Sequence, residues 1–545
     1  MVKRKFYIVM ALAAVSALLL WSVALGEDLP GNKNKQDKSL SKVTGSPQYQ
    51  ILNINNITSW TRYDGPSNHS PSGDNGVYYP VGTGNVVYED AFVFGGKIYS
   101  NAALTTRPTV QPVRVEGTTF SASGYVGTKG GWVTGSGATA VAVSPNDPDA
   151  RCYRIRRDYF FMSDQELVYD AQTSNELASP TLVTQTMKDR IKEQYDTDWK
   201  AWANIVPKGA PYIERNGVPG FQAPPAFSAS FTPENLISGK HDEPGVAGAD
   251  PNSPADQVIW LVYNELDASQ SVRFTGSQPI GVEIQKTIWG YKRTDAMGNI
   301  YFNRYRMINK GGVDVGGGVR GSFWVDSMYV CAWADVDLGD AGDDLMGSDS
   351  LLSIGFIYNG KPVDATFAGF NLPPPASGYA FLAGPQVAAP GDSAVFNFQR
   401  IYGKRNLPLS SAIYFSAGSP YTDPPGGAAN YNTSAFQWYG MLQGYAPAGN
   451  FGSSYSKYNV PPGVDPNTRF MMSGDPVTQT GFVDGKGTNY SFAPGDRRLL
   501  CNSGPFLFAP GDTNETYVGF VVGLGADRLS SVSVMKFNYT FVANT

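Results

Sequence analysis

The sequence predicts a mainly β protein of β-sandwich-type architecture, with long Pro/Gly-rich loops and one small helical insert. Gly and Pro account for 61 and 38 of the 545 residues, which is typical of many turns and few long helices. Short segments alternate apolar and polar side chains, as Val282 and Ile284 do with Glu283 and Gln285, and this period of two indicates strands. Many short strands joined by Pro-Gly turns favour two packed sheets.

Residues 1–26 have the features of a cleaved signal peptide. A basic start at residues 3–5 precedes a long apolar run, and Ala24 and Gly26 are small residues that suit cleavage before Glu27. The alternative is an uncleaved anchor, because the apolar run approaches the length that spans a bilayer. We expect a secreted chain, extracellular or at the cell surface, with no membrane span after cleavage.

Two regions are expected between the signal peptide and the helical insert. Residues 27–48 are rich in Lys, Asn, Gln and Ser, and we expect them to form a disordered polar tether. Residues 49–160 contain short apolar segments separated by turn residues. This pattern predicts an N-terminal β-rich region, with a hairpin around Gly95 and Gly96.

The helical insert is expected over residues 161–204. Ser163 and Glu166 have the spacing of a capping box at the start of a first helix. In a second helix, four apolar residues recur at four-residue spacing and would share one face: Met187, Ile191, Tyr195 and Trp199. We expect this face to pack on a sheet; the alternative is a face that binds a partner.

The remainder of the chain is divided into a loop region and a sandwich region. Residues 205–256 are dominated by Pro and Gly and are predicted to be a long loop region. Residues 257–545 carry the strongest strand patterns and are predicted to form the β-sandwich region. Near the end, Met535, Phe537 and Tyr539 alternate with polar residues, which predicts a closing strand with one buried face.

Several chemistries lack support in the sequence. The net charge of −5 argues against nucleic acid as a partner, which requires a concentrated basic surface. The histidines, His69 and His241, lie in polar segments without a G-x-S-x-G or H-E-x-x-H pattern. Cys152, Cys331 and Cys501 are widely separated, so we expect buried free thiols, with one disulfide as the alternative.

Two glycine-rich runs, at 127–137 and 314–321, superficially suggest phosphate loops. Neither run contains the G-K-[ST] sequence of such a loop, and strand-like segments flank both. Both runs are therefore predicted to be hairpins.

The best site candidate is the segment 333–350, which contains no basic residue. Closely spaced carboxylates repel one another unless a cation lies between them, and oxygen-rich loops suit calcium. Gly339 and Gly342 would let the chain curl so that several carboxylates converge. The predicted ligands of a structural calcium ion are Asp335, Asp337, Asp340, Asp343, Asp344 and Asp349.

Two observations limit this interpretation of the acidic segment. The order of Gly339 and Asp340 does not match an EF-hand, and Met346 stands where a bidentate Glu is required. A solvated acidic turn, with aspartates that cap backbone amides, is the alternative. No catalytic residue is assigned, because no base, nucleophile or His accompanies the segment, and the sequence favours a protein that is not an enzyme.

A resemblance is carried by the strand and loop segments QVIWLVYNELDASQS, IYFNRYRMINKGG, ADVDLGDAGDDLMGSD, SGYAFLAGPQV and FLFAPGDTNETYVGFVVGLGADRLSSVSVMKF. These segments resemble large, mostly uncharacterised secreted proteins of Gram-negative bacteria, many of them similar to substrates of the type IX secretion system. The resemblance implies location and architecture, not activity. Such proteins often carry a further Asp-x-Asn-Gly-Asp-Gly loop; here Glu214, Asn216 and Gly217 are followed by Val218 and Pro219, so a second calcium is not expected.

Two functions remain open from the sequence. The first is an exported, calcium-stabilised β-rich protein with a structural or adhesive role at the cell surface or in an extracellular assembly, with self-association or other surface proteins as partners. The second is a secreted carbohydrate-binding or polysaccharide-hydrolysing protein, because aromatic residues make up 13% of the chain. Aromatic residues are also typical of β-sandwich cores, and we expect core packing to take most of them. Trp438 and the Tyr-rich segment after it are the best candidates for an exposed sugar-binding surface.

Overall fold

The computed structural model describes residues 48–544, apart from residues 74, 225–239, 249–252 and 419. The predicted signal peptide (1–26) and all but the last residue of the predicted tether (27–48) lie outside the described residues. The fold is mainly β, as the sequence predicts, and antiparallel strands form its two largest sheets.

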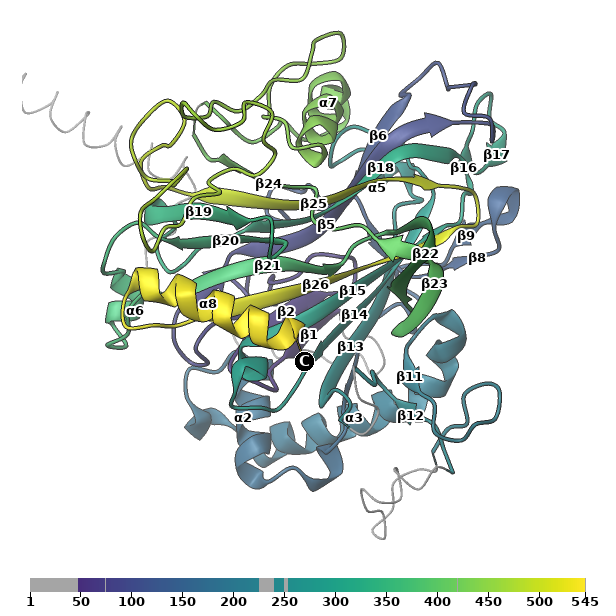
Figure 1. The fold of residues 1–545 in the computed structure, drawn as a ribbon. Helices are drawn as coiled ribbons and strands as arrows, with labels where there is room; N and C mark the ends of the chain where they lie inside the picture. The colour runs from purple at the N-terminus through teal and green to yellow at the C-terminus, as the bar shows by residue number, and fades with distance from the viewer. Residues whose placement is uncertain (1–47, 74, 225–239, 249–252, 419, 545) are drawn as a thin grey trace, which may run out of the picture. The chain divides into compact units, whose positions relative to one another are not determined.

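The larger sheet has nine strands (Figure 1). In spatial order its strands are β10 (Tyr153–Arg156), β13 (Gln257–Asn264), β14 (Val282–Gly290), β15 (Ile300–Asn309), β26 (Thr513–Gly523), β21 (Ala376–Ala383), β20 (Ile354–Asn359) and β19 (Asp344–Asp349), with β7 (Lys129–Gly130) paired to β13. The smaller sheet consists of β24 (Ser411–Ser416), β25 (Arg497–Phe508), β18 (Trp324–Asp335), β5 (Glu89–Tyr99) and β6 (Val113–Gly117).

Shorter strands and helices complete the fold. A four-stranded sheet contains β1 (Tyr49–Leu52), β2 (Thr58–Arg62), β3 (Val77–Tyr78) and β4 (Asn85–Val87). The two-stranded pairs are β8 (Val133–Thr134) with β9 (Val141–Ala142), β11 (Tyr212–Ile213) with β12 (Glu243–Pro244), β16 (Val313–Asp314) with β17 (Arg320–Gly321), and β22 (Gln386–Phe396) with β23 (Gln399–Asn406). Among the described residues, the α-helices are α2 (Asp164–Ser174), α3 (Gln185–Ile205), α5 (Ala268–Ser271), α6 (Ala365–Ala368), α7 (Tyr431–Leu442) and α8 (Arg528–Ala543). Short 3-10 helices are η1 (Gly137–Thr139), η2 (Tyr159–Phe161), η3 (Pro180–Leu182), η4 (Val206–Lys208), η5 (Ala296–Asn299), η6 (Ala341–Asp343) and η7 (Ala428–Asn430).

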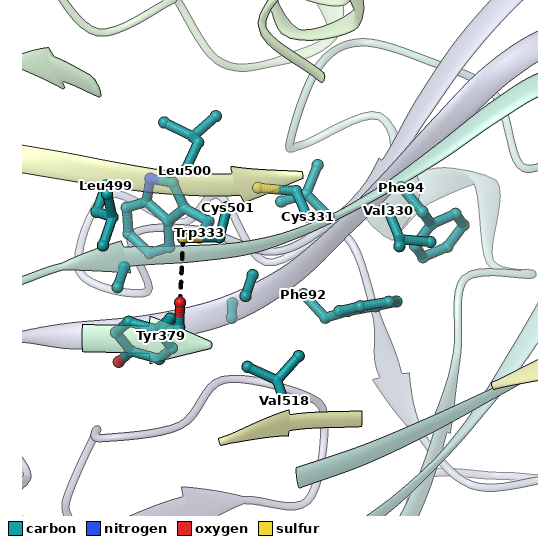
Figure 2. Packing of buried hydrophobic residues seen from close by; sticks show 14 of the residues in the cluster. Phe92, Phe94, Val330, Cys331, Trp333, Tyr379, Leu499, Leu500, Cys501 and Val518 are labelled. Carbon is teal, nitrogen blue, oxygen red and sulfur yellow. Dashed lines mark hydrogen bonds between the residues drawn. The ribbon is translucent and has the colours of Figure 1, made fainter. Parts of the chain in front are cut away.

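The two large sheets pack face to face around a shared apolar core. Figure 2 shows Leu499 and Leu500 of β25 in the same cluster as Tyr379 of β21 and Val518 of β26. The thiol of Cys501 donates a hydrogen bond across the interface to the Tyr379 carbonyl, at 3.5 Å. This arrangement confirms the predicted β-sandwich-type architecture.

Helices cover much of the outer face of the nine-stranded sheet, and this third layer explains why its central strands are buried on both faces. Every residue of β13 is buried, since one face belongs to the core between the sheets and the other belongs to the apolar cluster of the α2–α3 insert. On α3, Ile191, Tyr195 and Trp199 are buried, whereas Met187 lies at the margin of the same cluster. The predicted insert is therefore confirmed, including the capping box between Ser163 and Glu166.

The predicted closing strand is wrong, because residues 528–543 form helix α8. Asp527 caps this helix by accepting hydrogen bonds from two backbone N–H groups of the first turn. Met535 and Tyr539 are buried, whereas Phe537 is 64% exposed, so burial follows the helical period. Gly523 of β26 permits close packing, since a Cβ there would lie 2.2 Å from the Met535 nitrogen.

The predicted hairpin around Gly95 and Gly96 is also wrong. Both glycines lie inside the long strand β5, where they pair with β6. A Cβ at Gly96 would lie 2.5 Å from Cγ1 of Val325 on β18, so this glycine permits close strand packing and does not mark a turn. The run at 314–321 does form a hairpin, through β16 and β17. In the run at 127–137, β7 joins the larger sheet and β8 pairs with β9.

The two β-rich regions expected along the sequence share their sheets. β5 from the first region pairs with β18 from the second, and β10 pairs with β13. The three cysteines are free and buried, as predicted, and burial raises the pKa of Cys501 to about 12. Among the described residues, no helix is both long enough and apolar enough to cross a bilayer.

Candidate metal centre

The acidic segment begins where β18 ends, and its six aspartates lie in different surroundings. β18 ends at Asp335 and β19 begins at Asp344, with the short helix η6 between them. Asp335, Asp343 and Asp349 are each paired with a basic residue outside the segment. The absence of local basic residues is therefore offset in part by residues distant in the sequence.

Asp340, Asp343 and Asp349 do not converge on one point. Asp340 is exposed and accepts a hydrogen bond from the Gly342 N–H at 2.9 Å. Asp343 is buried, lies 3.3 Å from the Lys361 ammonium, and accepts a hydrogen bond from the Asn359 side chain. Each of these two carboxylates thus has a local structural role.

Asp349 is paired with the last helix. Its Oδ2 lies 2.8 Å from Nζ of Lys536 on α8, and its Oδ1 accepts hydrogen bonds from two backbone N–H groups of the following turn. The prediction that one ion collects all six aspartates does not match this geometry.

Asp335 and Asp337 instead meet a third carboxylate, Asp496, which immediately precedes β25. One oxygen of each residue lies within 4.8 Å of the others. Asp335 is 3% exposed, and Asp337 and Asp496 are half-buried. Three carboxylate oxygens at this separation can bind one divalent cation between them.

Asp344 adds a fourth carboxylate close to this group. It is fully buried, and its Oδ2 accepts a hydrogen bond from the Leu338 N–H at 3.4 Å. Its Oδ1 has no hydrogen-bond partner among the described residues. A buried carboxylate oxygen without a donor is costly, so this atom is a natural acceptor for a cation or for a water molecule bound to one. We call Asp335, Asp337, Asp344 and Asp496 the acidic cluster.

Arg498 of β25 supplies positive charge at the edge of the acidic cluster. Its guanidinium lies 3.2 Å from Asp335 Oδ1 and 2.8 Å from Asp496 Oδ2, and it packs over the ring of Phe120. Asp423, which follows β24, raises the local negative charge further by acting on Asp335 and Asp496. One guanidinium thus faces several carboxylates, and negative charge remains in excess.

Burial is the main cause of the shifted pKa values in the cluster. Burial, followed by repulsion from Asp337, raises the pKa of Asp335 well above its usual range. The same two causes raise the pKa of Asp344, and burial raises the pKa of Asp496. A bound cation would oppose all three shifts, because opposite charge favours the ionised carboxylate.

The other candidates from the sequence lie elsewhere. Trp438 is on helix α7, is 3% exposed, and packs against Phe274 and Phe415. Trp438 therefore packs in the core, as most aromatic residues are expected to do, and the alternative of an exposed sugar-binding surface does not apply to it. The rings of His69 and Tyr49 are stacked, 6.2 Å apart, and His69 is not part of the acidic cluster.

The side chain of Asp242 fixes the loop at 214–222 through hydrogen bonds. The Asp242 carboxylate accepts hydrogen bonds from the backbone N–H groups of Arg215, Asn216 and Gln222. Burial acts to raise the pKa of Asp242, but these three hydrogen bonds outweigh it and lower the pKa. These three hydrogen bonds hold the loop closed around Asp242.

No protein-family model matches the chain, and no curated protein is similar to it. Function is therefore inferred from the geometry of the site.

The sequence pointed to Asp335, Asp337 and Asp344 but missed Asp496 and Asp423. Asp496 lies in the segment SFAPGDRRLL, where two arginines follow it directly. Such a neighbourhood indicates a neutralised surface carboxylate. Only the pairing of β25 with β18 brings this residue to Asp335.

Proposed function

We propose that the protein is an exported β-rich protein stabilised by calcium at the acidic cluster, with a structural or adhesive role at the cell surface or in an extracellular assembly. The observation that carries the proposal is the group of three carboxylate oxygens of Asp335, Asp337 and Asp496 within 4.8 Å of one another. Calcium prefers several oxygen ligands and accepts irregular geometry.

The position of the acidic cluster supports a structural role for the ion. Asp335 ends β18 and Asp496 precedes β25, both in the smaller sheet, whereas Asp344 begins β19 in the larger sheet. An ion held by these residues would connect the two sheets of the sandwich and the loop at 336–343. Its binding free energy would add to the free energy of unfolding.

The chemistry of the acidic cluster also supports a structural ion. The acidic cluster consists of carboxylates, and the guanidinium of Arg498 is paired with two of them. No histidine belongs to the group of potential ligands among the described residues. The proposal therefore assigns the acidic cluster a structural role, and activation of water is not part of it.

The edge strands of the two sheets indicate whether another chain could pair with them during assembly. The outer edge of β24 is paired through Ala412 with Arg469 and Met471. At the outer edge of β19, the Ser348 N–H donates to the Met472 carbonyl at 3.1 Å. The segment 469–472 therefore occupies both edges, and protection of this kind prevents strand addition by another chain. We propose that self-association or adhesion uses faces and loops instead of these edges.

The calcium proposal is tested by thermal unfolding of the mature chain in EDTA and in calcium. A calcium concentration of 100 times the dissociation constant would stabilise the fold by about 2.7 kcal/mol, which raises Tm by about 2–3 °C in a chain of this size. The double variant Asp337→Asn/Asp496→Asn should lose the response. Asp340→Asn, a matched change at an exposed carboxylate of the same segment, should retain it.

Two outcomes would contradict the calcium proposal: a Tm that does not respond to millimolar calcium, or a response that survives in the double variant. Magnesium should stabilise less than calcium, because it requires near-ideal octahedral geometry. Export is tested separately, by fractionating the producing cells and sequencing the N-terminus of the protein. A chain that stays in the cytoplasm with residues 1–26 intact would refute it.

A further inference from the structure

A cleft of about 480 Å³ lies on the outer face of the nine-stranded sheet, well within the volume range of small-molecule sites. It is bounded by β14, β15, β8 and the short helix η4. Glu283 and Gln285 alternate on β14 and therefore point to the same face, away from Val282 and Ile284 in the inter-sheet core. This part of the outer face is polar, although much of the face around it is covered by apolar contacts with helices.

The carboxylate of Glu283 and the amide of Gln285 are held in defined orientations. Glu283 accepts hydrogen bonds from the Val133 N–H and, at 2.8 Å, from the Gln285 Nε2 group. This leaves Gln285 Oε1 without a hydrogen-bond partner among the described residues, although Gln285 is only 4% exposed. A buried acceptor of this kind favours a ligand that donates a hydroxyl or an N–H group.

Positive charge is in excess around the cleft. The half-buried Lys310 has no ion pair or side-chain hydrogen bond within the described ranges. Arg306 shares one carboxylate, Glu515, with Arg304, at nitrogen–oxygen distances of 3.5 and 3.7 Å. Lys208 is paired with Asp149 at 3.0 Å. The cations around the cleft therefore number four, and the carboxylates number three: Glu515, Asp149 and Glu283. One positive charge remains uncompensated.

Trp132 provides an aromatic wall. It is half-buried and lines the cleft, and the ammonium of Lys208 lies 3.7 Å from the centroid of its ring. Pockets for small molecules commonly combine aromatic walls with a few fixed polar groups. Here the fixed groups are one neutral acceptor and one uncompensated cation.

We propose that this cleft binds an acidic saccharide, with its carboxylate at Lys310 and Arg306, a hydroxyl donating to Gln285 Oε1, and a sugar ring beside Trp132. A simple anion would use the cation but leave the Gln285 acceptor unpaired. A neutral sugar would satisfy the acceptor but leave the charge uncompensated. Only a hydroxylated carboxylate matches both features, and the site shares no residue with the acidic cluster.

The test is isothermal titration of the full mature protein with two matched disaccharides, digalacturonate and galactobiose. They differ in whether C6, the carbon attached to C5 of each ring, is a carboxylate or a hydroxymethyl group. Digalacturonate should bind at least tenfold more tightly than galactobiose, and sodium acetate at tenfold excess should not displace it. Binding should quench tryptophan fluorescence, and Trp132→Phe should remove this signal.

Variants test whether digalacturonate binds in the cleft or is attracted nonspecifically by surface charge. Lys310→Gln and Arg306→Gln should each weaken digalacturonate binding at least tenfold while the circular dichroism spectrum stays unchanged. Lys404→Gln, which removes an exposed lysine of β23, should bind as the wild type does. The wild type should bind digalacturonate equally well in EDTA and in calcium, so that failure of the calcium proposal and failure of this one are separable.

The proposal is overturned by any of four results. These are equal affinity for galactobiose, displacement by acetate, equal weakening by Lys404→Gln, and absence of digalacturonate binding at 10 mM ligand, a concentration of the order at which even a weak millimolar site is detected.

Discussion

Arg498 lies directly opposite Asp335 in the pairing of β25 with β18, and its Nε is 3.2 Å from Asp335 Oδ1. The same guanidinium reaches Asp496 Oδ2 at 2.8 Å. Arg498 therefore occupies two of the carboxylates that would otherwise be fully available to a metal ion. Arginine and a divalent cation would compete for the same negative charge, and this competition can be measured.

Replacement of Arg498 by Met should increase the dependence of the fold on calcium. In EDTA the variant should lose about 3–5 kcal/mol of unfolding free energy, the cost of leaving buried carboxylates without their partner. Calcium should restore part of this loss, so the gain on adding calcium should exceed the gain of the wild type. Denaturant unfolding in EDTA and in calcium checks both values, and an equal gain in the two proteins would contradict the competition.

A second buried ion pair anchors the helical insert to the larger sheet. The Arg154 guanidinium on β10 lies 3.0 Å from both carboxylate oxygens of Asp170 on α2, and both residues are nearly inaccessible. Arg154→Met should therefore cost about 3–5 kcal/mol, since it leaves the Asp170 carboxylate buried and unpaired. Lys200→Ala, which removes an exposed pair on α3, should change stability by less than about 0.5 kcal/mol. Urea denaturation of both variants tests the contrast; equal effects would argue against the anchor.

Glu265 should make the stability of the fold fall as pH rises. Burial raises its pKa from 4.5 to about 7, although the N–H groups of Val282, Gly281 and Ile280 and the charge of Arg114 act in the opposite direction. Between these two values the folded chain keeps a proton that the unfolded chain has released, so unfolding becomes easier as pH increases. The group should account for about 3 kcal/mol lost between pH 4.5 and 7, with no further loss above that range.

Glu265→Gln removes this titration, whatever its absolute stability. The difference in unfolding free energy between wild type and variant should decrease by about 3 kcal/mol across that pH interval. Chemical denaturation at half-unit pH steps gives the two curves. Parallel curves would show that Glu265 titrates normally in the folded chain.

The burial of residues on α8 distinguishes this helix from the strand expected from the sequence. Met535 is fully buried and Phe537 is 64% exposed, whereas a strand with one buried face would bury both. Met535→Ala should cost about 2–5 kcal/mol, and Phe537→Ala should stay within about 0.5 kcal/mol. Thermal and denaturant unfolding measure both, and similar losses at the two positions would favour the strand.

The errors in the sequence interpretation share one physical cause. Met535 and Tyr539 fit a period of two as well as a period of four, and only packing against β26 decides between them. Gly95 and Gly96 were predicted to mark a turn because glycine is common there. In the fold they are needed for close approach of β6 and β18, a requirement that arises only between strands distant in the sequence.

The sequence by itself determined the mainly β class, the α2–α3 insert with its capping box, the buried free thiols and the location of excess negative charge. These features depend on local periodicity, local hydrogen bonds and composition, which are present in a short stretch of chain. The tertiary structure alone decided which carboxylates meet. Asp496 lies beside Asp335 and Asp337 because of the register of β25 on β18. Asp343 and Asp349 form ion pairs elsewhere, with Lys361 and Lys536 respectively. Charge acts through space, so the composition of a site depends on the long-range pairing of strands that no local pattern specifies.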